Sequence, residues 1–212
     1  MSGPATPHII RHVTQALLRI VHSGMPSDVR PEDVVAAPPE MVSRTSSGQI
    51  VALYLYRVVE SPDLKNQGPH YESAPAVPPD EAENVVIRRD PLALNLHYLL
   101  IPFGADESFL ETYELLGLAM KSLHDNSNFT LGEWPDLVGL TEEEAKLEFR
   151  IVPEPLTISE LGQIWEAVHE PYRLSVSYAL RTVQIKSDDE ETIRRVVARR
   201  LAAGQDVPQG PR

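Results

Sequence analysis

The stretch that decides the fold is IVALYLYRVV, residues 50–59. β-Branched, aromatic and aliphatic side chains fill nearly all of its odd and even positions, so both sides of an extended chain here are apolar. A strand of this composition is covered on both faces, as happens in the interior of a sheet. We therefore expect residues 50–59 to form a central strand.

Two longer strands follow from alternating patterns. Residues 92–103 are apolar with Asn95 and His97 at alternate positions, which predicts a strand with one dry face and one polar face. Residues 172–185 alternate imperfectly, and the pattern slips at residues 181–182. We expect a long strand that is bent or bulged at this slip and that borders solvent or a partner.

A shorter strand is predicted at residues 145–151, where apolar and charged side chains alternate strictly. Thr141 and Glu144 spell a helix-capping box just before it. Because a period of two extends through the whole segment, we give it more weight than the local capping signal and predict a strand with one solvated face.

Helices are expected at residues 8–22, 108–124 and 157–170, because apolar residues recur there every three or four positions. Capping boxes strengthen the starts of the last two. Helices and strands interleave along the chain, which indicates an α/β (α+β) fold: a single domain with a mixed, mostly antiparallel sheet flanked by helices.

The 19 prolines gather at residues 26–39 and 62–91. Proline fixes φ and removes a backbone donor, so these segments are predicted to be long irregular loops. The segment from residue 60 to residue 91 is longer than an ordinary connection in a compact domain. We expect it to be functional or mobile, and to become ordered against a partner.

A last helix is predicted from Ser187, which forms a capping box with Glu190, to Gly204. Acids at its start precede bases near its end, the order that the helix dipole favours. These bases are Arg194, Arg195, Arg199 and Arg200. Residues 205–212 are expected to be a disordered tail. The predicted organisation is thus a domain over residues 1–186 and a charged helix with a tail over residues 187–212.

Composition excludes several classes of function. A formal net charge of −12 opposes contact with nucleic-acid phosphates. The chain has no cysteine, so it has no disulfide, thiolate nucleophile or cysteine-based zinc site. No segment approaches the roughly 20 apolar residues of a membrane helix, and the first residues do not resemble a signal peptide. We expect a soluble protein made in the cytoplasm that binds neither nucleic acid nor membrane.

The sequence shows no motif that carries chemistry. HExxH, GxSxG, GxxxxGK[ST] and GxGxxG are all absent, and the carboxylate runs lie in predicted loops or first turns. We therefore predict no catalytic residue, cofactor or metal. The two isolated histidines that could act as bases, His97 and His124, support one alternative: a hydrolase or small-ligand enzyme that uses them with a nearby carboxylate.

Several blocks, read in order, resemble a known family. They are LYLYR at 53–57 with LKN at 64–66, PLALNLHYLL at 91–100, LGLAM at 116–120 with LHDN at 123–126, FRIVPEPL at 149–156, and PYRLSVSY at 171–178. Over about residues 8–186 the chain resembles the cap, or tail-terminator, proteins of extracellular contractile injection systems such as the anti-feeding prophage and virulence-cassette particles.

This resemblance implies a structural protein without catalytic activity. It implies a homo-oligomeric ring, expected to be a hexamer, on the end of the inner tube and sheath away from the baseplate. The ring would stop tube growth and anchor the sheath, so the expected partners are further copies of the chain and the tube and sheath subunits. The particle that contains it could be released from the cell or kept inside.

Partner contacts are expected on the strand at 172–185 and on the terminal helix, because an unpaired strand edge can accept a partner's strand. The candidate residues are Tyr172, Arg173, Ser175, Ser177, Arg181, Arg194, Arg195, Arg199 and Arg200. A further alternative is a peptide-binding adaptor or chaperone that uses strand addition without forming a ring.

Overall fold

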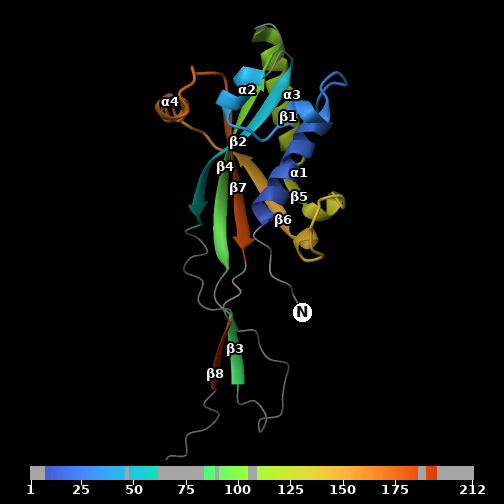
Figure 1. Ribbon diagram of the computed structural model, residues 1–212, viewed down its shortest axis with the longest axis vertical. Coiled ribbons are helices and arrows are strands. Elements are labelled where there is room, and N and C mark those ends of the chain that lie inside the picture. Colours follow the sequence, from blue (N-terminus) through green and yellow to red (C-terminus); the bar gives the residue numbers. More distant parts are fainter. Residues whose placement is uncertain are drawn as a thin grey trace, which may run out of the picture. The chain divides into compact units, whose positions relative to one another are not determined.

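Residues 50–59 lie in β2 (Ile50–Glu60), which pairs antiparallel with β4 (Leu92–Phe103) in the computed structural model (Figure 1). These strands belong to a six-stranded sheet with the order β1-β2-β4-β7-β6-β5. Its other strands are β1 (Val34–Val35), β5 (Asn128–Thr130), β6 (Glu148–Pro153) and β7 (Val176–Ile185). Among the described strands of this sheet, only the β1–β2 pair is parallel, so the predicted mixed, mostly antiparallel sheet is confirmed.

The structure describes residues 8–45, 48–61, 84–88, 91–104, 109–185 and 190–194. They fall into two compact units. The first contains residues 8–61 and 91–185, and with them the six-stranded sheet. The second contains residues 84–88 and 190–194.

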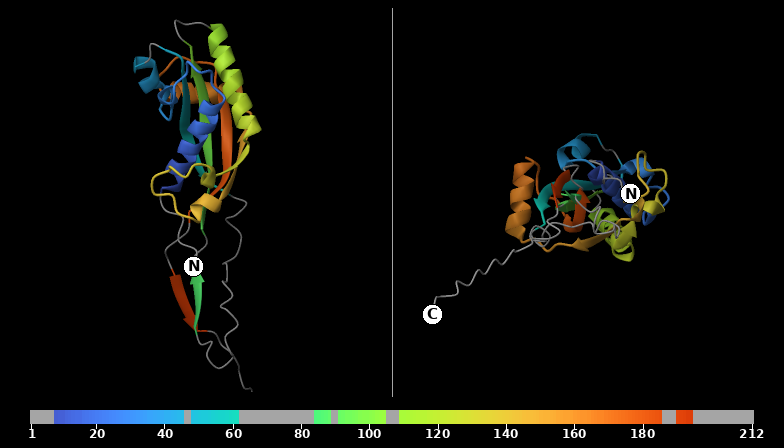
Figure 2. Two further views of the ribbon diagram at one scale, coloured as in Figure 1. Left: turned by 90° about the vertical axis from the view of Figure 1, so that its right-hand side faces the viewer. Right: turned by 90° about the horizontal axis from the view of Figure 1, so that it is seen from below.

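Helices cover both faces of the sheet. On the first face lie α1 (Ile9–Ser23) and α3 (Phe109–Asp125), and on the second face lie the shorter α2 (Pro39–Thr45) and α4 (Ile158–Ala167). The view from below shows α4 in orange on one side of the strands and α1 and α3 on the other (Figure 2). Single 3₁₀ turns form η1 (Pro31–Asp33), η3 (Leu131–Glu133) and η4 (Glu144–Lys146).

The two faces have separate cores. The first is the larger and packs the apolar sides of α1 and α3 against all six strands; its fully buried members include Leu17, Leu53, Leu96, Leu100, Leu123 and Ile151. The second is small and consists of Val42, Ala52, Leu99, Ile101, Phe103 and Trp165. Because these residues lie at the Phe103 end of β4, the helices of the second face cover only that end of the sheet (Figure 1).

Bulges interrupt two strands. In β2 the register passes from Leu55, opposite Tyr98, to Arg57, opposite His97, so Tyr56 is an extra residue. In β7 two residues, 181 and 182, stand opposite Asn95 alone. The bulge predicted from the slipping pattern at residues 181–182 is therefore confirmed.

Two expectations about strand position hold only in part. β2 lies between two strands, but the two residues of β1 pair only with Val51 and Ala52, and no described strand pairs with that side of β2 beyond them. β7 is covered by β4 on one side and by β6 at residues 178–181 on the other, so its residues 182–185 lack a described partner strand on that second side. β1 was not predicted, because two residues are too few to show a periodic pattern.

The segment 145–151, predicted to be one strand, is a 3₁₀ turn at its start and a strand only from Glu148. The Thr141–Glu144 capping box does form: the Glu144 amide donates to Thr141 Oγ1 at 3.2 Å, and the Thr141 amide donates to Glu144 Oε2 at 3.0 Å. The box lies just before η4, whose N-cap is Glu143, and β6 begins only at Glu148. The local cap therefore outcompeted the alternation over the first residues.

The expected C-terminal helix is also corrected. Residues 190–194 form β8 (Glu190–Arg194), which pairs antiparallel with β3 (Asn84–Arg88) in the second unit. β3 lies inside the segment predicted to be an irregular Pro-rich loop. A helix with so narrow an apolar stripe is unstable alone, whereas a β-branched partner strand supplies backbone pairing, and this long-range contact overrode the helical pattern. Residues 195–204 of the predicted helix lie outside the described residues, and the domain boundary at residue 186 stays a prediction.

Candidate functional site

The residues expected to contact partners occupy different environments. Tyr172 is 55% exposed, and the Arg173 guanidinium lies over the Phe103 ring, 5.3 Å from its centroid. Arg181 is exposed in the bulge of β7. Arg194 belongs to β8 in the second unit, and Arg195, Arg199 and Arg200 lie outside the described residues.

Two of these candidates do not lie at the surface. Ser175 and Ser177 are 6% and 3% exposed. Trp165 Nε1 donates to Ser175 Oγ at 3.3 Å, so this hydroxyl holds α4 against the sheet. The expectation that both serines face a partner was wrong, because alternation in an interior strand covered on both faces does not separate buried from exposed positions.

Ser177 belongs to a cluster of four polar side chains on the second face, which we call the Glu154 cluster: Tyr56, His97, Glu154 and Ser177. Glu154 Oε2 accepts from all three others, at 2.6 Å from His97 Nδ1, 3.2 Å from the Tyr56 hydroxyl and 3.3 Å from Ser177 Oγ. The Tyr56 and Ser177 hydroxyls lie 2.9 Å apart. The cluster joins β2, β4, β7 and the end of β6.

The charge on Glu154 is stabilised by its neighbours. Partial burial raises the pKa of this carboxyl, but the hydrogen bond and charge of His97, with the hydroxyls of Tyr56 and Ser177, outweigh burial and place the pKa below its usual value. Burial raises the pKa of Tyr56. Glu154 is therefore an ionised acceptor and Tyr56 a neutral donor near neutral pH.

This arrangement does not form a nucleophile–base pair. In a serine hydrolase the hydroxyl bonds to the imidazole, and the carboxylate orients the imidazole from its other side. Here the Ser177 hydroxyl donates to the carboxylate instead. His124 lies on α3, across the sheet from His97, so the two histidines do not share a site.

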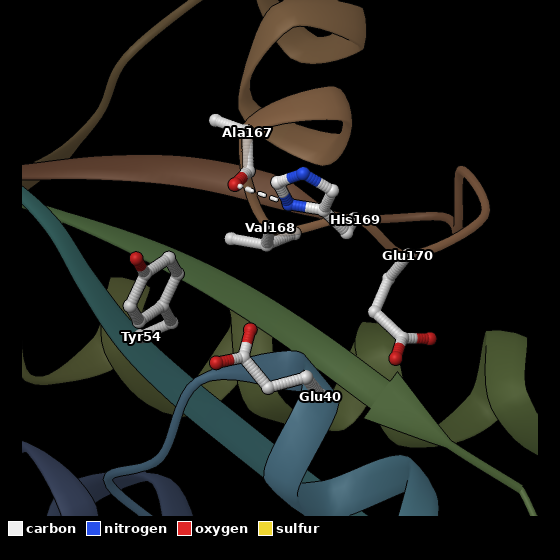
Figure 3. A pocket seen from close by; sticks show the side chains of 6 residues that line it. All are labelled: Glu40, Tyr54, Ala167, Val168, His169 and Glu170. Carbon is white, nitrogen blue, oxygen red and sulfur yellow. Dashed lines mark hydrogen bonds between the residues drawn. The ribbon is translucent and has the colours of Figure 1, made fainter.

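A separate pocket of about 410 Å³ lies on the second face between the start of α2 and the end of α4 (Figure 3). Tyr54 lines it from β2, Glu40 from α2, and residues 167–170 from the end of α4. His169 has a positive φ of 57°, and its Nδ1 lies 3.1 Å from the Ala167 carbonyl oxygen. The pocket offers two carboxylates, an imidazole and a phenol.

No group of three or more histidines, aspartates or glutamates stands in a metal-binding arrangement within the part of the chain that the structure describes. Among those residues, no helix combines the length and the apolar character needed to cross a bilayer.

The chain matches a known protein family over most of its length. The family model of the Pvc16 N-terminal domain matches residues 12–199. The chain belongs to this family. The Pvc16 N-terminal domain match covers most of the chain and confirms the resemblance to injection-system terminators. A comparison with curated proteins gave no significant match.

Two solved structures share the fold of this Pvc16 N-terminal domain. The sheath/tube terminator of an extracellular contractile injection system, PVC, in its extended state matches with a TM-score of 0.60 and 17% identity, over 98% of this chain and 66% of that one. The tube-terminating cap of the anti-feeding prophage matches with a TM-score of 0.59 and 16% identity, over 90% and 60%. The chain thus spans less than two thirds of either structure's length.

Two features were not predicted from the sequence: the place of Glu154 on the second face of the sheet, and the side of β2 that lacks a described partner strand beyond Ala52. Arg150, Val152 and Glu154 are alternate residues of the chain, whereas Phe149 and Ile151, at the other positions, are buried in the first core. Alternation therefore places Glu154 on the second face. That signal was present in the sequence. The open side of β2 had no such signal, because it depends on how short β1 is.

Proposed function

We propose that this chain is a terminator domain of a contractile injection system: a non-enzymatic cap that ends the inner tube and anchors the sheath at the end away from the baseplate. The observation that carries the proposal is the agreement of two comparisons. The Pvc16 N-terminal domain model matches residues 12–199, and the fold matches terminators of two different particles. The chain works as a homo-oligomeric ring, a hexamer, assembled in the cytoplasm and carried by the extracellular particle.

Exposed apolar side chains on the first unit support an assembly role. At the start of α3, Phe109, Leu110 and Tyr113 are 72%, 79% and 53% exposed, although all three are large and apolar or aromatic. Large apolar residues left in water at one site are typical of surfaces that a partner covers. The side of β2 beyond Ala52 supports strand addition by a tube or sheath subunit.

Of the expected partner contacts, Tyr172, Arg173 and Arg181 are exposed and stay in the proposed set. Arg194, Arg195, Arg199 and Arg200 also stay in it as predictions, and residues 1–186 remain the proposed terminator domain. Ser175 and Ser177 leave this set because they are buried.

Electron microscopy of particles from cells that lack this protein tests the proposal. A terminator sets where assembly stops, so its absence should give tubes of uncontrolled length with poorly attached sheaths and no end density. Re-expression of the full chain should restore capped particles. Uniform, capped particles without the protein would refute the assignment, and a monomeric mass with no density at particle ends would favour the adaptor alternative.

A further inference from the structure

The half of the second face that lies beyond α2 and α4, the described helices on this side, presents three arginines from three strands: Arg57 on β2, Arg181 on β7 and Arg150 on β6. All three are exposed. We call them the arginine face. Arg57 stands opposite His97 and Arg181 opposite Arg150 in the strand register, and His97 pairs with Ala179, two residues from Arg181. The arginines are therefore neighbours on one surface.

The bulge in β2 is needed to build this surface. Leu53 and Leu55 face the first core, so strict alternation would send Arg57 into that core; the extra residue at Tyr56 turns it to the second face instead. In β7, alternation from Ser177 and Ala179 already places Arg181 on the second face, and the bulge at 181–182 returns Val183 to the first core.

The pairing of Arg150 with Arg181 is unfavourable within one chain. Side chains directly opposite in an antiparallel pair have Cβ atoms about 4.5–5.5 Å apart, and like charges there are destabilising. No described carboxylate lies within ion-pair distance of Arg57, Arg150 or Arg181.

The acids near these arginines form no ion pair with them among the described residues. Glu154 accepts three hydrogen bonds within its own cluster. The capping-box bonds of Thr157 lower the pKa of Glu160, and the charge of Arg57 adds a smaller contribution in the same direction. Glu148 is exposed two residues before Arg150.

Three guanidinium groups without an ion-pair partner among the described residues fit a carboxylate-rich surface, because each can bind a carboxylate through two parallel hydrogen bonds. The chain has a surplus of carboxylates, with 31 acidic residues against 19 basic ones. A closed ring requires two different surfaces of each copy to meet head to tail. We propose that the arginine face binds an acidic surface of the neighbouring copy in the ring, an inference that rests on the function proposed above.

A triple variant tests this proposal: Arg57→Gln, Arg150→Gln and Arg181→Gln in the full chain. Its matched control is Arg11→Gln, Arg19→Gln and Lys121→Gln, which removes the same number of positive charges from the helices of the first face. Light scattering after gel filtration should show an oligomer for the wild type and the control, weakened by salt. The triple variant should associate roughly tenfold to a hundredfold more weakly, and it should fail to cap particles.

An unchanged oligomer in the triple variant, or a wild type that is monomeric at every salt concentration, would overturn the proposal. Normal particle length with the triple variant would overturn it while leaving the terminator function intact. Normal, capped particles in the complete absence of the protein would instead overturn the function itself.

A cross-link identifies directly which protein binds the arginine face. The chain has no cysteine, so Asn128→Cys, exposed and opposite Arg150 in the register, gives a single attachment point for a photo-cross-linker. In particles we expect cross-links to an acidic stretch of another copy of this chain. Cross-links to tube or sheath subunits alone would overturn the proposal and assign the arginine face to them.

Discussion

At the residue scale, Glu154 connects four strands through a single oxygen atom. Replacing Glu154 by Gln removes the charge that His97 faces. We expect the free energy of unfolding at neutral pH to fall by about 1–3 kcal/mol, the usual result of disrupting hydrogen bonds to a charged, partly buried group. Urea unfolding of Glu154→Gln measures this, and Glu148→Gln, at an exposed position without such bonds, should change little.

The effect of Glu154 should depend on pH. Its folded pKa lies below the ordinary value of 4.5, so its contribution is fully present above pH 4.5 and is lost as the pH falls through the folded pKa. The stability difference between the wild type and Glu154→Gln should therefore shrink in acid. A difference that is constant from neutral pH into acid would show that the carboxylate's charge contributes nothing.

His169 occupies a backbone conformation that suits glycine. The amide of Glu170 donates to the Trp165 carbonyl and that of His169 to the Glu166 carbonyl, the pattern in which a helix ends on a left-handed residue, here with φ 57°. His169→Gly should raise the free energy of unfolding by about 0.5–1 kcal/mol because the Cβ clash disappears. Gln163→Gly, inside the same helix, should lower it by about 1 kcal/mol. A destabilised His169→Gly variant would contradict this account.

At the scale of elements, α4 depends on one side chain. Trp165 is 2% exposed, packs in the second core and bonds Ser175, whereas Ile158 at the start of the helix is 84% exposed. Trp165→Ala should cost about 3–5 kcal/mol of stability, the range for emptying a buried aromatic site. Ile158→Ala should stay within about 0.5 kcal/mol. Chemical denaturation distinguishes the two, and equal losses would show that α4 is held elsewhere.

At the scale of the whole molecule, the two strands of the second unit come from segments about a hundred residues apart. A two-stranded sheet is marginally stable, so each strand needs the other. Truncation after Lys186 removes β8, and hydrogen exchange at residues 84–88 should then lose its protection. Protection in β2 and β4 is the internal control and should not change. Retained protection at residues 84–88 would mean that another element pairs with β3.

The sequence by itself determined the elements whose signals are local and long. Helix α1, the strands β2 and β4, the bulge at residues 181–182 and the capping box of Thr157 all followed from periodicity or from contacts within one turn. The family resemblance also followed from ordered blocks of sequence, and the family match confirmed it.

Only the tertiary structure decided which strands are neighbours. Pairing of β8 with β3, the interior position of β7 and the open side of β2 depend on contacts between residues far apart in sequence, which no local pattern encodes. The arginine face has the same origin: its side chains share one surface because the bulge of β2 and the strand register bring three separate segments together.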